Sequence, residues 1–295
     1  MAQTVTLITG ASTGLGQATA LHLARKGHHV FATMRSPERG GGPLRDAVTK
    51  EGLKITIAAL DVRDPASVTR AVDAALADAG HIDVLVNNAG IGDLGALELA
   101  SDELTQAMFD TNVFGCLRMI RAVLPSMRAQ GSGTIVNVSS VAGLIVGGGN
   151  GLYAGTKHAL EAISESLAIE VMQFGIRVAI IEPGFFDTPI IDKAAGAITA
   201  AGDAPYANVE RRMAGVYMAG KAAGAGDPQV VAETIEHAIS TTEPKLRYLV
   251  GVDAGVFARE RPRMTDEEYV HAFGHVQTDD EWFTEFMTRF PMPTA

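Results

Sequence analysis

The chain has 295 residues, of which 47% are hydrophobic and 20% charged, a balance typical of a globular protein. Its 24 basic and 34 acidic residues give a net charge of −10, which argues against nucleic acid as a partner. We find neither an apolar run long enough to span a membrane nor a signal peptide, so we expect a soluble, cytoplasmic protein without a membrane span. The single cysteine, Cys116, excludes an internal disulfide, and no cysteine cluster indicates a metal site.

A predicted strand, a glycine turn and a predicted helix open the chain. Residues 5–9 are apolar and β-branched, and residues 10–16 read Gly-Ala-Ser-Thr-Gly-Leu-Gly before a helical pattern. Glycines allow a close backbone approach, and the free N–H groups at a helix start attract a pyrophosphate. We expect a nucleotide cofactor here, although such a turn can also join a strand to a helix without a ligand. The expected contacts are Gly10, Ser12, Thr13, Gly14, Leu15 and Gly16.

The second predicted strand, residues 29–34, ends where the ribose of a dinucleotide lies in a doubly wound sheet. An acidic residue there would bind the ribose hydroxyls, but the chain has Met34, followed by Arg35 and Ser36. A guanidinium can hold a phosphate through two hydrogen bonds. We therefore expect Arg35 and Ser36 to bind the 2′-phosphate of NADP(H), with NAD(H) possible; the alternative is an ordinary surface arginine.

Two further apolar runs, residues 54–60 and 82–86, predict the third and fourth strands. Asp61 and Val62 follow the third strand, where Asp61 could cap the next helix. Asn88 lies just after the fourth strand, and its amide could bind neighbouring strand ends and hold the sheet together. A long helical stretch is then expected from residue 101 to residue 130.

The most informative stretch follows a buried strand predicted at residues 134–138. It contains Ser139 and Ser140, and then Tyr153 and Lys157. The tyrosine and the lysine are four residues apart, so they share one face of a helix. An ammonium beside a phenol favours the ionised phenol, which can then exchange protons near neutral pH. A strand-end hydroxyl could face this phenol, but the strand pattern does not choose between Ser139 and Ser140.

Together these motifs resemble the short-chain dehydrogenase/reductase family. The chain matches its Thr-Gly-x-x-x-Gly-x-Gly turn, its Asn-Asn-Ala-Gly segment and its Tyr-x-x-x-Lys motif, with a serine thirteen residues before the tyrosine. That spacing selects Ser140, whose hydroxyl would bind the substrate oxygen. The resemblance implies that Tyr153 moves the proton, that Lys157 supports the phenol and holds the ribose, and that Asn112 anchors a water in a proton relay. An exposed helix asparagine is the alternative for Asn112.

The same resemblance implies further cofactor contacts. An aspartate in the place of Asp61 contacts the adenine, and a threonine in the Pro-Gly-x-x-x-Thr motif, here Thr188, meets the nicotinamide carboxamide or a phosphate. We expect Asn88 to be mainly structural and Gly90 to contact the cofactor. The additional cofactor-binding residues are Asp61, Val62, Asn88, Ala89, Gly90, Pro183, Gly184 and Thr188, beside Tyr153 and Lys157.

The alternation of strands and helices, completed by strands at 177–182 and 246–250, predicts a doubly wound, parallel, seven-stranded Rossmann-type α/β sheet in a single domain over residues 1–250. We interpret residues 190–226 as a substrate lid, although ordinary helix packing would fit as well. Residues 251–295 form an extension in which four aromatic residues indicate a docked amphipathic end: Trp282, Phe283, Phe286 and Phe290. The family's helix pairing implies a homodimer or homotetramer.

We expect an NADP(H)-dependent oxidoreductase that transfers a hydride between the nicotinamide and a secondary alcohol or ketone. The Phe-Ala-Thr-Met-Arg segment resembles the steroid, retinol and carbonyl reductase branch of the family, which implies an apolar steroid-, retinoid- or aryl-ketone-like substrate. Two alternatives remain: a binding protein that senses NADP(H) without turnover, and an NAD(H)-dependent alcohol dehydrogenase of the same fold.

Overall fold

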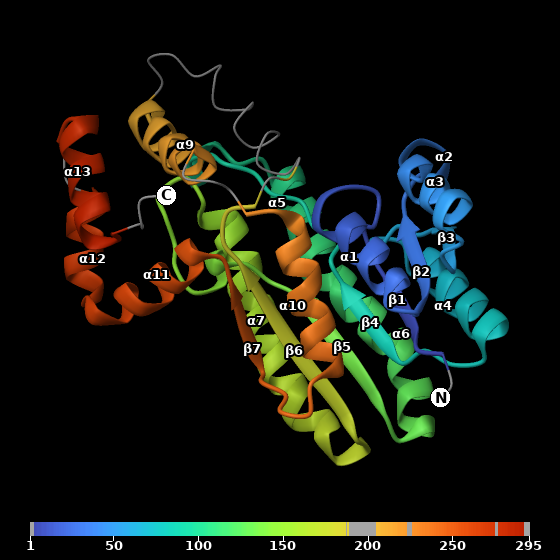
Figure 1. Ribbon diagram of the computed structural model, residues 1–295. Helices are drawn as coiled ribbons and strands as arrows, with labels where there is room; N and C mark the ends of the chain where they lie inside the picture. Colours follow the sequence, from blue (N-terminus) through green and yellow to red (C-terminus); the bar gives the residue numbers. More distant parts are fainter. Residues whose placement is uncertain (1–2, 187, 189–204, 223–225, 275–276, 292–295) are drawn as a thin grey trace.

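Seven parallel strands form one sheet in the order β3-β2-β1-β4-β5-β6-β7 (Figure 1). The computed structural model describes residues 3–186, 188, 205–222, 226–274 and 277–291. The strands are β1 (Val5–Ile8), β2 (His29–Met34), β3 (Ile55–Ala59), β4 (Val84–Asn87), β5 (Gly133–Val138), β6 (Ile176–Pro183) and β7 (Arg247–Val250). The predicted seven-stranded, doubly wound sheet is therefore confirmed.

Helices cover both faces of the sheet (Figure 1). One face packs against α1 (Gly14–Arg25), α3 (Gly42–Glu51) and α10 (Pro228–Ser240). The other packs against α4 (Pro65–Ala79), α6 (Gly115–Gln130) and α7 (Gly151–Val171). The shorter α2 (Pro37–Gly40) and α5 (Asp102–Phe109) precede α3 and α6 in the chain. Because the central strands such as β1 and β4 are covered on both sides, they are buried at every position rather than at alternate ones.

The central strands divide their side chains between two cores. In β1, Leu7 contributes to the core under α4, α6 and α7, and Ile8 contributes to the core under α1, α3 and α10. Leu85 and Val86 of β4 divide in the same way. Leu7 pairs with Leu85 in the parallel register, so like-facing side chains stack from strand to strand. This register brings the carboxyl ends of the strands to one edge of the sheet.

The expected helix from residue 101 to residue 130 is wrong in its middle. The chain forms α5, then one π-helical turn from Asp110 to Phe114, and then α6. Gly115 lets the start of α6 pack closely against Val62, since a Cβ at residue 115 would lie 2.7 Å from the Val62 Cγ2. Such a turn re-aims the side chains that it carries, and Asn112 is one of them.

The C-terminal extension is a folded part of the structure. It forms α11 (Val252–Glu260), α12 (Asp266–Gly274) and α13 (Asp279–Arg289), of which α13 lies beside α9 (Ala207–Ala222) (Figure 1). Phe257 and Phe290 are buried at the centre of an aromatic cluster, and the Arg212 Nε of α9 lies 2.9 Å from the Asp279 Oδ1 of α13. Residues 190–204 and 223–225 of the expected lid lie outside the described residues, and α9 forms most of its described part. No helix among the described residues is long and apolar enough to cross a membrane.

Candidate active site

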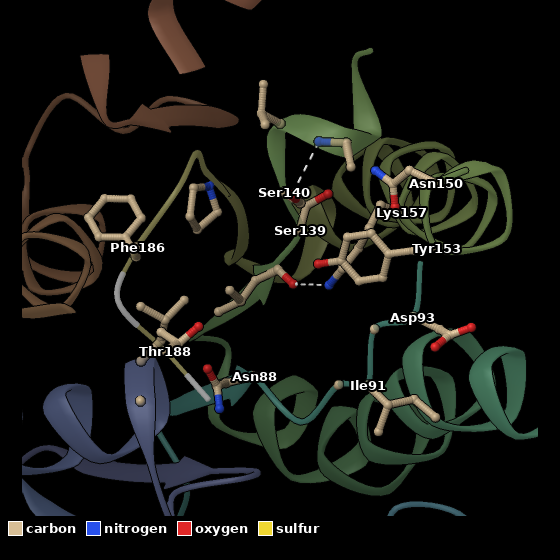
Figure 2. Close-up of a pocket in the computed structure, with 18 of the residues that line it drawn as sticks. Asn88, Ile91, Asp93, Ser139, Ser140, Asn150, Tyr153, Lys157, Phe186 and Thr188 are labelled. Carbon is tan, nitrogen blue, oxygen red and sulfur yellow. Dashed lines mark hydrogen bonds between the residues drawn. The ribbon is translucent and has the colours of Figure 1, made fainter. Parts of the chain in front are cut away.

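A cavity of about 430 Å³ opens at the carboxyl ends of the central strands. The glycine turn after β1, the segment after β4, the end of β5 and the start of α7 all line it (Figure 2). Most predicted site residues meet here: Gly10, Ser12, Thr13, Gly14, Leu15, Arg35, Asp61, Val62, Asn88, Ala89, Gly90, Ser140, Tyr153, Lys157, Pro183, Gly184 and Thr188. Gly16, Ser36 and Asn112 do not line the cavity.

Ser140, Tyr153 and Lys157 lie together at one wall of the cavity (Figure 2). Lys157 is only 6% exposed, and its Nζ donates a hydrogen bond of 2.9 Å to the Val138 carbonyl at the end of β5. The same nitrogen lies 5.6 Å from the centroid of the Tyr153 ring. The Ser140 Oγ accepts a hydrogen bond from the Ala142 N–H at 3.1 Å, which fixes the hydroxyl at the strand end. The arrangement places a fixed ammonium beside a phenol that is open to the cavity.

Asn112 does not line the cavity, but it hydrogen-bonds to the segments next to it. It is 1% exposed, so the alternative of an exposed helix asparagine is wrong. Its amide exchanges two hydrogen bonds of 2.9 Å with the backbone of Ile91, and its Nδ2 also lies 3.0 Å from the Thr156 Oγ1. The π-helical turn thus ties the segment after β4 to α7, between Tyr153 and Lys157.

The glycine turn is shaped by close contacts that a side chain would break. Gly10 has a φ of +69°, and a Cβ there would lie 2.8 Å from the Ala89 Cα. A Cβ at Gly16 would lie 2.3 Å from the Asn88 Nδ2. That Nδ2 donates hydrogen bonds to the carbonyls of Thr9, at 2.9 Å, and Gly10, at 3.1 Å. Asn88 therefore holds the end of β4 against the turn, and Gly16 leaves room for it.

The start of α1 suits an anion. Thr13 occupies the N-cap position, but its side chain makes no capping hydrogen bond, and the first turn contains no acidic residue. No side chain therefore caps the N–H groups at this helix start, and these groups lie at the positive end of the helix dipole. Together with the close-packed glycine turn, they fit the pyrophosphate of a dinucleotide.

Arg35 lies exposed at the mouth of the cavity, next to the buried end of β2. Its guanidinium makes no hydrogen bond or ion pair with another residue that the structure describes. Ser36 does not line the cavity, and its Oγ accepts a hydrogen bond of 2.9 Å from the Arg39 guanidinium of α2. The structure therefore brings only the first residue of the expected pair to the site.

Asp61 lies at the edge of the cavity, and the alternative prediction, that Asp61 caps the next helix, is wrong. Asp64, not Asp61, caps α4 by accepting a hydrogen bond from the Ala66 N–H at 2.9 Å. Partial burial works against ionisation of Asp61, but hydrogen bonds from the backbone and side chain of Arg63 lower the pKa of the Asp61 carboxyl below its ordinary value. Asp61 is thus an ionised acceptor beside the cavity.

The segment after β6 closes the cavity on its other side. The Gly184 N–H donates to the Val250 carbonyl at 2.9 Å, and the Phe185 N–H donates to the Asp253 Oδ2 at 2.6 Å. A Cβ at Gly184 would lie 2.1 Å from that same carboxylate. Thr188 is buried and lines the cavity (Figure 2). The first helix of the extension, α11, thus anchors the segment that carries Thr188.

Some lining residues lie in segments expected near the substrate, and others were not predicted because no local pattern marks them. Tyr217 comes from α9, within the expected lid, and Phe286 comes from the aromatic C-terminal end, whereas Phe257 and Tyr269 of the extension were not expected here. Burial, slightly offset by Arg261, raises the pKa of Tyr269 to about 12, and its hydroxyl donates to the Val146 carbonyl at 2.6 Å. The lining residues that no prediction covered include Ile91, Asp93, Phe257 and Tyr269.

Comparison with known families and proteins agrees with this geometry. A family model described as short chain dehydrogenase matches residues 4–197. The chain is 42% identical over 188 residues to a 3-ketodihydrosphingosine reductase of Bacteroides thetaiotaomicron, a match that covers 64% of this chain and 66%, just under two thirds, of that protein. It is 38% identical over 252 residues to human retinol dehydrogenase 8, covering 82% and 79% of the two chains.

Solved structures show the same fold. A short-chain dehydrogenase from Streptomyces avermitilis has a TM-score of 0.76 at 36% identity, with 89% of this chain and 93% of that chain covered. A Burkholderia phymatum short-chain dehydrogenase/reductase in complex with NAD has a TM-score of 0.76 at 28% identity, covering 88% and 93%. A Thermococcus sibiricus alcohol dehydrogenase complexed with 5-hydroxy-NADP has a TM-score of 0.68 at 25% identity, covering 84% and 96%.

Proposed function

This chain belongs to the short-chain dehydrogenase/reductase family, and we propose that it is an NADP(H)-dependent enzyme that interconverts an apolar secondary alcohol and its ketone. Family membership makes it an oxidoreductase that uses a nicotinamide cofactor on CH–OH groups. One observation carries the proposal: the Lys157 ammonium is held beside the Tyr153 phenol in the same cavity that the glycine turn lines.

The cofactor would lie between the glycine turn and α7. Gly10, Gly14 and the start of α1 would hold the pyrophosphate, Asp61 the adenine end and Lys157 the ribose, with Thr188 near the nicotinamide. The nicotinamide supplies or accepts the hydride. The remaining lining residues of the turn and the strand ends would complete the binding surface, namely Ser12, Thr13, Leu15, Val62, Ala89, Gly90, Pro183 and Gly184.

Arg35 supports the preference for NADP(H). Its exposed guanidinium follows β2 at the cavity mouth, and the cavity lining there carries Met34 in place of an acidic residue. A 2′-phosphate would meet a cation with free donors where β2 itself ends in Met34 rather than an acidic residue, although the Asp61 carboxylate after β3 acts on Arg35 from the neighbouring strand. The cofactors of the related structures, NAD in one and 5-hydroxy-NADP in another, occur in the same fold, so the preference depends on residues such as Arg35.

Proton transfer would use residues already fixed in place. In the direction of reduction, the Tyr153 hydroxyl donates its proton to the carbonyl oxygen, and the Ser140 hydroxyl donates a hydrogen bond to the same oxygen. The Lys157 ammonium, held by the Val138 carbonyl, stabilises the phenolate that remains. Asn112 would act as the anchor of a water that returns a proton from solvent. In oxidation the same steps run in reverse.

The far wall of the cavity supports an apolar substrate. Phe185, Phe257, Phe286 and Met213 present rings and a thioether to it. Phe257 packs against Phe185 with ring centroids 6.3 Å apart and against Phe286 at 6.1 Å. Burial of aromatic surface favours rings or alkyl chains over sugars. We further propose that residues 1–250 form the catalytic domain and that 251–295 complete its substrate wall.

Exposed apolar side chains near α6 and α7 support a homodimer or homotetramer. Ile169 is 74% exposed and Met172 is 73% exposed at the end of α7, and Phe114, just before α6, is 49% exposed. A second copy of the chain would remove this surface from water. Size-exclusion chromatography with light scattering tests this oligomeric state, and a monomer at micromolar concentration would contradict the proposal.

The proposed function is tested by following nicotinamide absorbance with NADPH and with NADH against a panel of apolar aryl ketones. We expect turnover with NADPH to exceed turnover with NADH. Arg35→Ala should lower the affinity for NADPH by at least about tenfold, the loss of one charge-assisted phosphate contact, and leave the affinity for NADH unchanged. Arg39→Ala, an exposed arginine outside the cavity, is the matched control. Equal loss for both cofactors in Arg35→Ala would overturn the NADP(H) assignment.

A further inference from the structure

We propose that the cavity has a second polar subsite, formed by Tyr217 and Asn150, which binds a second oxygen of the substrate close to the reacting carbonyl. The inference rests on the proposed function, because the reacting oxygen is taken to lie at Ser140 and Tyr153. It names the substrate class more narrowly: an apolar ketone that carries a neighbouring carbonyl or hydroxyl group.

Tyr217 is the first member of this subsite. It lies on α9 and lines the cavity, with its ring edge-on to Phe185 at a centroid distance of 4.9 Å. Its hydroxyl makes no hydrogen bond with any residue that the structure describes. Burial, and to a smaller extent the phenol of Tyr153, raises the pKa of Tyr217 above its ordinary value. The hydroxyl therefore stays protonated and is available as a donor.

Asn150 is the second member. It is 7% exposed and lines the cavity one helical turn before Tyr153 (Figure 2). It stands at the N-cap of α7, but its side chain does not cap the helix, and its Oδ1 is buried without a hydrogen-bond partner among the described residues. A buried amide that serves no structural bond costs free energy unless a ligand satisfies it.

The loop that ends at Asn150 lies against α9, the helix that carries Tyr217. A Cβ at Gly149 would lie 3.9 Å from the Met213 Cβ, and a Cβ at Gly147 would lie 2.0 Å from the Met213 Cε, so the loop packs directly on α9. Tyr217 is four residues after Met213 and shares its face of the helix. The Coulombic effect of Tyr153 on Tyr217 agrees with this closeness.

The chemistry of the subsite follows from its surroundings. The lining groups packed with Tyr217 are apolar, namely Phe185, Leu94 and Met213, so two polar groups in this wall select a substrate with one matching oxygen. A ketone without that oxygen would leave the Tyr217 hydroxyl unpaired in the bound state. Discrimination, rather than overall rate, is therefore the property that this subsite controls.

The test compares benzil with deoxybenzoin, which has the same carbon skeleton but only one carbonyl. We would measure kcat/KM for both with NADPH, and Kd for both by calorimetry with saturating NADP+, under which no reduction occurs. In Tyr217→Phe the benzil-to-deoxybenzoin ratio of kcat/KM, and of affinity, should fall about tenfold, as for one hydrogen bond. Asn150→Leu should lower it in the same direction. Tyr206→Phe, on the approach to the same helix, should leave it unchanged.

The two readouts separate this subsite from the proposed function. If NADPH reduces neither ketone but the affinity ratio falls in Tyr217→Phe, the subsite stands and the oxidoreductase assignment fails for these ketones. If both ketones are reduced but the ratio is the same in wild type, Tyr217→Phe and Asn150→Leu, the subsite is overturned. If neither ketone binds, the subsite is also overturned. A substitution that merely loosened the fold would weaken both ligands alike and leave the ratio unchanged.

Discussion

Glu182 should make the stability of this protein fall as the pH rises. It lies at the end of β6, is 1% exposed, and its Oε1 has no hydrogen-bond partner among the described residues. Burial, followed by the charge of Glu161, raises the pKa of Glu182 to about 7, and Arg247, whose Nε is 3.6 Å from its Oε1, opposes this. The folded state thus holds a proton that the unfolded state releases at lower pH.

The magnitude follows from the two pKa values. The unfolded carboxyl ionises near its ordinary 4.5 and the folded one near 7. Each pKa unit corresponds to about 1.4 kcal/mol, so ionisation costs the folded state about 3 kcal/mol once the pH is above 7. Stability is highest below the unfolded pKa and decreases through the interval between the two values. Glu182→Gln cannot ionise and should lose this decrease.

Urea denaturation at pH 5, 6, 7 and 8 measures the effect. We expect the free energy of unfolding of Glu182→Gln, relative to wild type, to rise by about 2–3 kcal/mol from pH 5 to pH 8. Glu165→Gln is the matched control, since Glu165 contacts the same Arg247 at 2.7 Å but is 56% exposed. Its difference from wild type should stay small and independent of pH. Parallel stability curves for wild type and Glu182→Gln would refute the reasoning.

Three further predictions follow from single contacts. Gly16→Ala places a methyl group 2.3 Å from the Asn88 Nδ2, so the free energy of unfolding measured in urea should fall by about 1–3 kcal/mol. The affinity for the cofactor, measured by fluorescence titration, should also fall. Wild-type values for both would contradict this packing. Asn112→Leu leaves the backbone groups of Ile91 unpaired, so stability should fall by at least about 2 kcal/mol, and an unchanged melting temperature would show that these bonds carry no stability. Cys116 is buried and burial raises its pKa to about 11, so iodoacetamide should modify it in urea but not in the native protein at pH 8; modification of the native protein would contradict its position.

The sheet and the glycine turn were predictable because their signals are local. A strand covered on both faces is rich in apolar and β-branched residues, as the segment before Gly10 is. A turn that packs against Ala89 and Asn88 must lack side chains at Gly10 and Gly16. The spacing of Tyr153 and Lys157 likewise fixes their relative position, because residues four apart lie on one face of a helix. In each case the physical cause lies within a few residues of the pattern.

The rest of the site depends on contacts between distant segments. The π-helical turn at Asn112 interrupts a sequence that reads as one helix, and nothing in its local pattern shows that Asn112 faces Ile91. Phe257 and Phe286 reach the cavity only because the extension folds back beside α9. Tyr217 lies in the expected lid, but neither it nor Asn150 belongs to a motif, and their significance comes from polar groups without partners among the described residues. Long-range packing of this kind is not encoded in the spacing of nearby residues.

The most direct test of the proposed chemistry is hydride transfer by Tyr153→Phe. The substitution removes only the hydroxyl, and Lys157 remains tied to the Val138 carbonyl at 2.9 Å, so NADPH should still bind with wild-type affinity. We predict that turnover of an apolar ketone falls at least about a hundredfold, the usual contribution of a general acid. Turnover near the wild-type rate in Tyr153→Phe would contradict the assignment of Tyr153 as the proton donor, and with it the central claim about this site.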